Sequence, residues 1–218
     1  MITIGILGAG EVGSQLARAA VRTGYEVVIA NSRGPETLAP LVRELGPSAR
    51  AAAAVDAAAA GDFAVLAFPW SREHDLPVAQ LAGKVVLDTN NHMPWRDGRV
   101  PEIDVGERTE HELRQEQLPD SKPAKAFTHI QAPSLFRMAR PAGAPDRLAL
   151  AVSSDFPEAV ALVTELYDRF GFDTVDHSPL RESWRSGPGT PAWRRHAIGQ
   201  TREELARNLA LAERVRLP

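Results

Sequence analysis

The feature that most constrains the fold is a glycine-rich motif near the amino terminus, because strand-like and helix-like segments enclose it. Residues 2–7 (ITIGIL) read as a short buried strand, and GAGEVG follows directly at residues 8–13. A helical stretch over residues 14–23 comes next, and then a second strand over residues 26–30. A G-x-G-x-x-G motif between a strand and a helix is typical of dinucleotide-binding proteins. The sequence therefore predicts a dinucleotide site here.

Each glycine of the motif has its own expected role. Gly8 permits a tight turn, Gly10 lets the backbone approach a pyrophosphate, and Gly13 lets the helix pack closely on the strand. The pyrophosphate would lie at the helix N-terminus, where free N–H groups and the helix dipole favour negative charge. Glu11 and Val12, which open this helix, are expected to contact the same cofactor.

The end of the second strand indicates which dinucleotide binds. An NAD site usually places an acidic residue there to hold the ribose 2′-hydroxyl. This chain has Asn31, Ser32 and Arg33 instead. The Ser32 hydroxyl and the Arg33 guanidinium suit a 2′-phosphate, which accepts charge-assisted hydrogen bonds. We therefore predict that these three residues contact the cofactor and that the cofactor is NADP.

Strand and helix signals alternate along the chain, which is typical of a parallel sheet covered by helices on both faces. A continuous apolar run at residues 62–68 is what a buried parallel strand requires, and the next strand is expected at residues 84–88. We predict an α/β fold, a Rossmann-type, doubly wound and mainly parallel sheet with a small C-terminal β-α extension. The expected division is an NADP-binding domain at residues 1–145, followed by a β-α-β extension with an acceptor loop and a terminal helix at residues 146–218.

The remaining elements have less distinct signals. Helices are expected over residues 34–45, 72–81, 107–117, 157–170 and 200–214, and strands over residues 49–51, 124–129, 147–153 and 172–176. Two long loops, at residues 91–106 and 178–196, are expected to lack regular structure, and loops of that length are usually functional or disordered. Leu205, Leu209 and Leu211 form an apolar stripe on the last helix, which predicts a core contact or a homodimer contact.

In a doubly wound sheet, ligands bind at the carboxyl ends of the strands. Phe68, Pro69 and Trp70 end one predicted central strand, and Asn90 follows the next one. We expect the first three to contact the cofactor through their backbone. Asn90 is expected to make a polar contact to the ribose or the nicotinamide.

Composition narrows the classes of ligand. The 218-residue chain has a net charge of −3 and scattered arginines, so nucleic acid is not an expected partner. The absence of cysteine excludes disulfides, thiolate metal sites and cysteine nucleophiles. The histidines lack metal-ligand spacing, so no metal is expected. His74 and His111 are expected to be solvated, and His129 follows a predicted strand end, a position from which it could reach the cleft. No apolar run is long enough to span a membrane and no leader precedes the first strand, so we expect a cytoplasmic protein.

Over most of its length the sequence resembles the NADP oxidoreductases that use coenzyme F420, a deazaflavin. The resemblance rests on residues 8–13, 30–38 (ANSRGPETL), 67–70 (AFPW), 88–91 (DTNN), 125–127 (KAF) and 183–191 (SWRSGPGTP). The first segment is generic to Rossmann folds, and the second and the last are more specific. The sequence departs from the family at Thr128, where the family typically has asparagine close to the cofactor cleft.

The resemblance implies hydride transfer between the nicotinamide of NADP and carbon 5 of a deazaflavin or a similar ring. Coenzyme F420 is then the implied co-substrate. The fold must stack two rings with the reacting carbons close together and water excluded. A ring-stabilised anion can take its proton from solvent, so no catalytic residue is assigned. Trp184, Arg185 and Trp193 are expected either to form a lid over the second ring or to pack the loop against the sheet.

Three alternatives stay open at this point. NADP-dependent reductases of imines, β-hydroxy acids or pyrrolines add an all-helical domain of about 100 residues. Here the tail begins with another strand pattern and has no lysine after Lys125, which disfavours that class. A non-catalytic NADP(H) redox sensor is compatible with the fold, because fold does not determine function. Thr128 also leaves open a flavin or a quinone in place of the deazaflavin.

Overall fold

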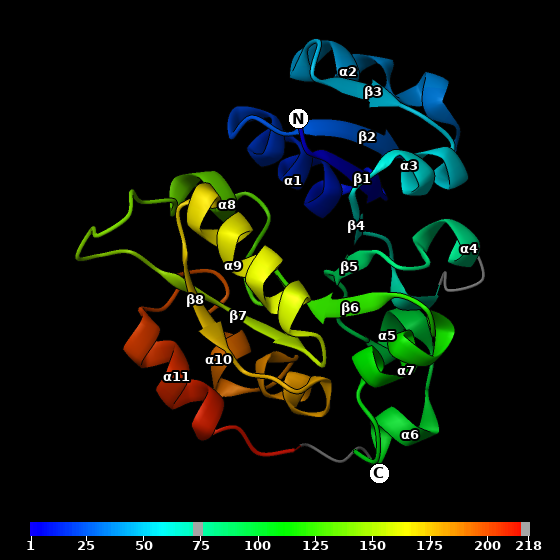
Figure 1. The fold of residues 1–218 in the computed structure, drawn as a ribbon. Coiled ribbons are helices and arrows are strands. Elements are labelled where there is room, and N and C mark those ends of the chain that lie inside the picture. The colour runs from blue at the N-terminus through cyan, green and yellow to red at the C-terminus, as the bar shows by residue number, and fades with distance from the viewer. Residues whose placement is uncertain (72–75, 215–218) are drawn as a thin grey trace.

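Eight strands form one sheet, as Figure 1 shows for this computed structural model, which describes residues 1–71 and 76–214. In sheet order the strands are β3 (Ala49–Ala51), β2 (Glu26–Ala30), β1 (Thr3–Leu7), β4 (Phe63–Leu66), β5 (Val85–Asp88), β6 (Lys122–Lys125), β7 (Ala149–Ser154) and β8 (Asp173–Asp176). All neighbouring strands are parallel except β6 and β7. The strand order reverses between β1 and β4, which confirms the predicted Rossmann-type, mainly parallel sheet.

Helices cover both faces of this sheet. They are α1 (Glu11–Arg22), α2 (Ala39–Leu45), α3 (Ala54–Ala60), α4 (Val78–Leu81), α5 (Pro94–Asp97), α6 (Pro101–Asp104), α7 (Glu110–Gln117), α8 (Ser134–Arg137), α9 (Pro157–Phe170), α10 (Pro191–Arg194) and α11 (Arg202–Ala210), together with the 3₁₀ helices η1 (Pro35–Leu38) and η3 (Leu180–Ser186). Helix α9 has the predicted bounds. Its proline takes the first helical position and Gly171 closes it in the left-handed conformation, two strong local signals.

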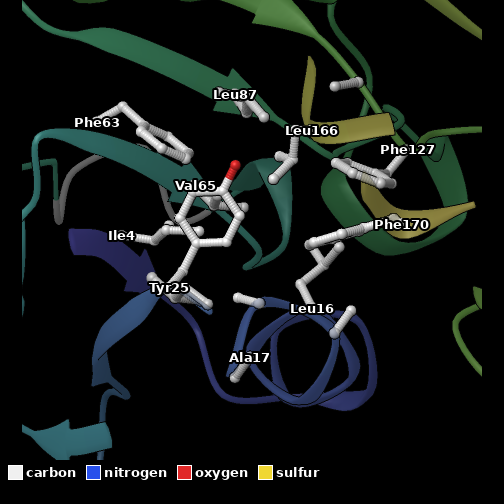
Figure 2. Packing of buried hydrophobic residues seen from close by; sticks show 14 of the residues in the cluster. Ile4, Leu16, Ala17, Tyr25, Phe63, Val65, Leu87, Phe127, Leu166 and Phe170 are labelled. Atoms are coloured by element: carbon white, nitrogen blue, oxygen red, sulfur yellow. The ribbon is translucent and has the colours of Figure 1, made fainter. Parts of the chain in front are cut away.

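A hydrophobic cluster covers each face of the central strands. The larger one joins α1 and α9 to the strands, and its members include Leu16 of α1, Leu166 of α9 and Val65 of β4, which Figure 2 labels. The smaller one joins Leu66 of β4 to Leu81 of α4 on the opposite face. Both faces of the central strands are therefore buried, which explains their continuous apolar sequence.

Several predicted boundaries are wrong, each for a local reason. The strand predicted over residues 124–129 ends at Lys125, because Phe127 takes a left-handed conformation (φ +60°) that cannot continue a strand. The loops predicted at residues 91–106 and 178–196 contain α5, α6, η3 and α10. A proline stands in the first turn of α5, α6 and α10, where its missing N–H is harmless.

Three of the predicted helices also differ from the structure in their bounds. Helix α7 begins at Glu110 rather than at residue 107, because the Thr109 hydroxyl caps it and Glu112 completes the capping box. The last helix ends at Ala210, so Leu211 is 63% exposed and does not belong to the buried stripe of Leu205 and Leu209. Of the helix predicted over residues 72–81, the structure describes α4; residues 72–75, with His74, lie outside the described residues.

The predicted C-terminal β-α-β unit is present as β7, α9 and β8. It joins the sheet through the antiparallel pairing of β6 with β7, and α9 packs within the larger cluster together with α1. The division at residues 145 and 146 falls in the connection before β7 and stays a prediction. Within the described residues, no helix is both long enough and apolar enough to cross a membrane.

Candidate functional site

The glycine turn after β1 has the close contacts that the motif requires. Gly8 has φ +110°, and a Cβ atom there would lie 2.3 Å from the Ala67 carbonyl oxygen. A Cβ atom on Gly13 would lie 1.8 Å from the Gly8 carbonyl oxygen. Both positions therefore exclude any larger residue. The turn is held to β2 because the Gly8 N–H donates to the Ala30 carbonyl at 2.9 Å.

Gly10 differs from the other two glycines because its surroundings are open. No atom lies within 4 Å of a Cβ atom built on it. It also precedes α1 as the N-cap residue without offering a side-chain cap. The first N–H groups of a helix have no partner within the helix, so the N-terminus of α1 faces a space that an anionic group can enter. This arrangement fits the pyrophosphate of a dinucleotide.

A hydrogen-bonded turn follows β2 and presents Ser32 and Arg33. The Asn31 side chain donates to the Thr37 hydroxyl at 2.8 Å and accepts from the Arg33 backbone N–H at 3.0 Å. The Thr37 hydroxyl in turn donates to the Gly34 carbonyl at 2.7 Å. Asn31 therefore uses its side chain to shape the turn, and the side chains of Ser32 and Arg33 are exposed at its surface.

Two adjoining cavities lie at the carboxyl ends of the strands. The first has a volume of about 640 Å³, and its walls include the predicted cofactor residues Gly8, Gly10, Asn31, Ser32, Arg33, Phe68 and Pro69. None of the described residues that line it carries a carboxylate. The second has a volume of about 630 Å³, and its walls include Gly10, Glu11, Val12, Phe68, Pro69 and Asn90. Gly10, Ala67, Phe68 and Pro69 line both, so the two cavities adjoin, and we call the pair the trough.

The far wall of the second cavity comes from segments that are distant in sequence. Phe127 and Thr128 follow β6, and Trp193 and His196 belong to α10 and the turn after it. The rings of Trp193 and His196 stack with centroids 4.4 Å apart and an angle of 27° between their planes. Asn91, which follows β5, is linked to this wall by a hydrogen bond: its side-chain amide donates to the Thr128 carbonyl at 2.8 Å.

Asn90 is held by a buried ion pair behind the cavity. Its side-chain amide donates to Asp88 Oδ1 at 2.5 Å, and Arg114 Nε of α7 donates to Asp88 Oδ2 at 2.9 Å. Asp88 and Arg114 are both fully buried. Burial alone would raise the pKa of Asp88, but the Arg114 guanidinium outweighs it and keeps that pKa below its usual value. The carboxylate therefore stays ionised and fixes the orientation of Asn90.

A second buried group of charges surrounds Lys125, at the end of β6. Lys125 Nζ donates to the Ser183 carbonyl at 2.9 Å and lies 3.6 Å from Glu110 Oε1. His111 is also fully buried, so its predicted solvation is wrong. Burial is the largest cause that lowers the pKa of His111 to about 4, and the positive charge of Lys125 adds to it, so this histidine is neutral near pH 7.

The sequence interpretation did not identify Arg114 or Glu110 as partners of these strand-end residues. One local signal does exist for them. The capping box at Thr109 fixes the phase of α7, and positions 110, 111 and 114 then share one helical face. That this face packs against β6 follows only from the tertiary structure, because charged residues on a short helix are more often solvated.

The structure does not bring every predicted residue to the trough. Trp70 is buried between Arg114 and His92 and is not among the described residues that line either cavity. Gly13 supports the turn from within α1. His129 lies 3% exposed, with its Nε2 accepting from the Ala151 N–H at 2.8 Å, so it contacts β7 and not the cleft.

The three residues predicted for a lid separate into two groups. Trp193 lines the second cavity. Trp184 lies elsewhere, with the guanidinium groups of Arg185 and Arg214 at 4.5 and 5.1 Å from the centre of its ring. No cluster of three or more potential metal ligands occurs among residues 1–71 and 76–214.

The comparisons with known proteins agree with this geometry. The family described as "NADP oxidoreductase coenzyme F420-dependent" matches residues 3–92, which extend from β1 to the strand-end residues after β5. A solved structure, hypothetical protein SMa0349 from Sinorhizobium meliloti, is 32% identical with a TM-score of 0.71, and the alignment covers 86% of this chain and 89% of that one. A second, from Arthrobacter sp. FB24, carries the provisional name F420-dependent NADP reductase. It is 25% identical with a TM-score of 0.71, over 83% of this chain and 86% of that one.

More distant or shorter matches add less. An imine reductase variant from Myxococcus stipitatus is 18% identical with a TM-score of 0.57, over 82% of this chain but only 55% of its own. Similarity at that level shows the fold alone. Escherichia coli (strain K12) protein YjhV is 43% identical over 53 residues, which are 24% of this chain and 39% of that relative's length.

Proposed function

The chain belongs to the NADP oxidoreductases of the coenzyme F420-dependent family, and on that premise we propose that it transfers a hydride between NADP(H) and a deazaflavin or flavin-like acceptor. In the reducing direction, the hydride leaves carbon 4 of the nicotinamide and bonds to carbon 5 of the deazaflavin, while the resulting anion takes a proton from solvent. The cofactors supply this chemistry, and the protein supplies orientation and electrostatics.

The observation that carries the proposal is the trough of two adjoining cavities. The first cavity contains the glycine turn and the β2 end, so it suits the adenosine half and the pyrophosphate of NADP. The second begins at the shared residues Gly10, Phe68 and Pro69 and extends to Trp193. A nicotinamide at this junction would meet an acceptor ring in the second cavity, which satisfies the need for two reacting carbons in close contact.

The walls of the second cavity suit a planar ring system. Phe68, Phe127 and Trp193 supply aromatic surface, whereas Asn90 and Thr128 supply polar groups. Ligand sites commonly combine a mostly apolar lining with a few polar groups that fix orientation. Thr128, the departure from the family sequence, lines this cavity, so its effect is expected on acceptor choice and not on NADP binding.

An anaerobic absorbance assay tests the proposal directly. Purified protein and NADPH are offered coenzyme F420, FMN and riboflavin in parallel. We expect loss of the deazaflavin absorbance at the rate of NADPH oxidation. A matched pair of variants then locates the acceptor: Trp193→Ala should raise its KM about tenfold, as loss of a stacking surface does, whereas Trp95→Ala, at an 83% exposed tryptophan of α5, should not.

Three alternatives predict different results in the same assay. Reduction of FMN or riboflavin without coenzyme F420 would assign a flavin as acceptor. Tight NADPH binding with every acceptor left oxidised would contradict the proposal, and would favour a redox sensor or a reductase of another small substrate. The latter class has less support, because the chain spans only 55% of the length of the imine reductase that it resembles.

A further inference from the structure

A side-chain hydroxyl interrupts the pairing of β6 with β7 beside the second cavity. The two strands pair antiparallel at Ala124 with Ser154 and at Lys125 with Ser153. Continued by two residues, this register would place Phe127 opposite Ala151, with a direct bond between their backbones. Instead, the Phe127 N–H donates to the Tyr167 hydroxyl at 2.9 Å, and that hydroxyl donates to the Ala151 carbonyl at 3.0 Å. Tyr167 thus relays one bond of the ladder.

The strand leaves the sheet at this point. Phe127 has φ +60° and is the sole non-glycine residue of the described chain with a positive φ. The residues that follow do not return to β7, because the Ala151 N–H donates to the His129 ring at 2.8 Å and not to a backbone carbonyl. Both backbone groups of Ala151 are therefore satisfied by side chains, and the segment after β6 is free to form a wall of the second cavity.

Tyr167 is suited to holding this arrangement. It lies on α9, is fully buried, and its ring packs edge-on against the Phe127 ring with centroids 4.8 Å apart. The hydroxyl has two partners at good distances, and its removal would leave the Phe127 N–H buried without one. The alternative for the chain is direct pairing with Ala151, which would draw Phe127 and Thr128 toward β7 and reshape the cavity.

We propose that Tyr167 is a positioning residue that keeps β6 open after Lys125 and so shapes the acceptor half of the trough. This proposal rests on the proposed function, because that function identifies the ligand of the second cavity as the hydride acceptor. Tyr167 itself is not among the described residues that line the cavity. The proposal therefore gives α9 an indirect role in acceptor recognition, through the path of the chain after β6.

The test compares Tyr167→Phe with Tyr25→Phe, since Tyr25 is the other buried tyrosine of the same hydrophobic cluster and its ring packs edge-on against Phe63 of β4 rather than against Phe127. Amide hydrogen exchange is measured over residues 126–132, together with the Kd for NADPH and the KM for the acceptor. In Tyr167→Phe we expect the exchange rate at Phe127 to change about tenfold, faster where the N–H is left unpaired and slower where it pairs directly with Ala151, and the acceptor KM to change about tenfold. The NADPH Kd should stay within twofold. Tyr25→Phe should change none of these.

The outcomes separate the two proposals. Unchanged exchange at Phe127, or an equal change in both variants, would overturn the positioning role. An unchanged acceptor KM despite altered exchange would also overturn it, because the path of the chain after β6 would then not shape the acceptor site. If the wild-type protein reduces no acceptor, the proposed function fails. The role of Tyr167 can still be decided in that case, by measuring riboflavin binding and exchange at Phe127 in both variants.

Discussion

At the residue scale, the three glycines of the motif have different surroundings, and their substitution should have different effects. Gly13→Ala places a methyl group 1.8 Å from the Gly8 carbonyl oxygen, so α1 must shift, and we expect a loss of about 2 kcal/mol or more in the free energy of unfolding. Gly10→Ala meets no atom within 4 Å and has an ordinary φ of −73°. It should leave the melting temperature within about 2 °C while weakening NADPH binding. Calorimetry and fluorescence titration check the pair; equal destabilisation by both would contradict the assignment.

Arg33 is expected to discriminate between NADPH and NADH. Arg33→Ala removes a charge-assisted contact to a 2′-phosphate, and we expect the Kd for NADPH to rise about 10- to 100-fold while that for NADH changes less than about threefold. Arg207→Ala, at an exposed arginine of α11, is the control. Isothermal titration with both nucleotides checks this, and an equal loss for NADPH and NADH would refute the 2′-phosphate role.

The sequence predicts a site residue when the residues around it are its neighbours in the chain, and it fails when they are distant in the chain. Gly8, Gly13 and Arg33 could be predicted, because a turn between a strand and a helix defines their surroundings. The pairing of Arg114 with Asp88 joins residues 26 positions apart, and no local pattern marks either as a partner of the other. The same holds for His129, which a strand-end position suggested for the cleft, but which the left-handed turn at Phe127 directs toward β7.

At the element scale, apolar runs and the positions of proline and glycine predicted α9 and every strand except β6 well. The short helices α5, α6 and α10 could not be predicted in the same way, since four residues carry no helical period. Helix α7 shows the limit most clearly. Its sequence EHELRQEQ reads as solvated, yet tertiary packing buries Glu110, His111 and Arg114 against the sheet.

The buried face of α7 provides a prediction about stability. Arg114→Met leaves the Asp88 carboxylate buried without its cation, and we expect the free energy of unfolding to fall by about 3–5 kcal/mol. Arg108→Met breaks a pair with Glu116 that is partly solvent-exposed, and should change it by less than about 1 kcal/mol. Urea unfolding of both variants measures the contrast. Similar small losses would show that Asp88 is stabilised by Asn90 alone.

At the scale of the whole molecule, buried histidines make stability depend on pH. Burial lowers the pKa of His111 and His129 to about 4, so in the folded state both stay neutral at a pH where the unfolded chain binds protons. Lowering the pH from 7 to 5 therefore favours unfolding, by about 2 kcal/mol for each histidine. Asp88 and Glu110, whose pKa values are lowered, contribute their own acid sensitivity only at lower pH. Urea unfolding at several pH values checks this, and His111→Gln should flatten the curve.

The junction of the two cavities has a kinetic consequence. Because the two cavities are separate spaces that share Gly10, Phe68 and Pro69 as walls, the nucleotide and the acceptor would occupy the protein at the same time if each fills one cavity. Initial rates measured over a grid of both concentrations should then give intersecting double-reciprocal lines, the signature of a ternary complex. Parallel lines would instead require that the first product leave before the second reactant enters, and the protein would have to store two electrons between these events.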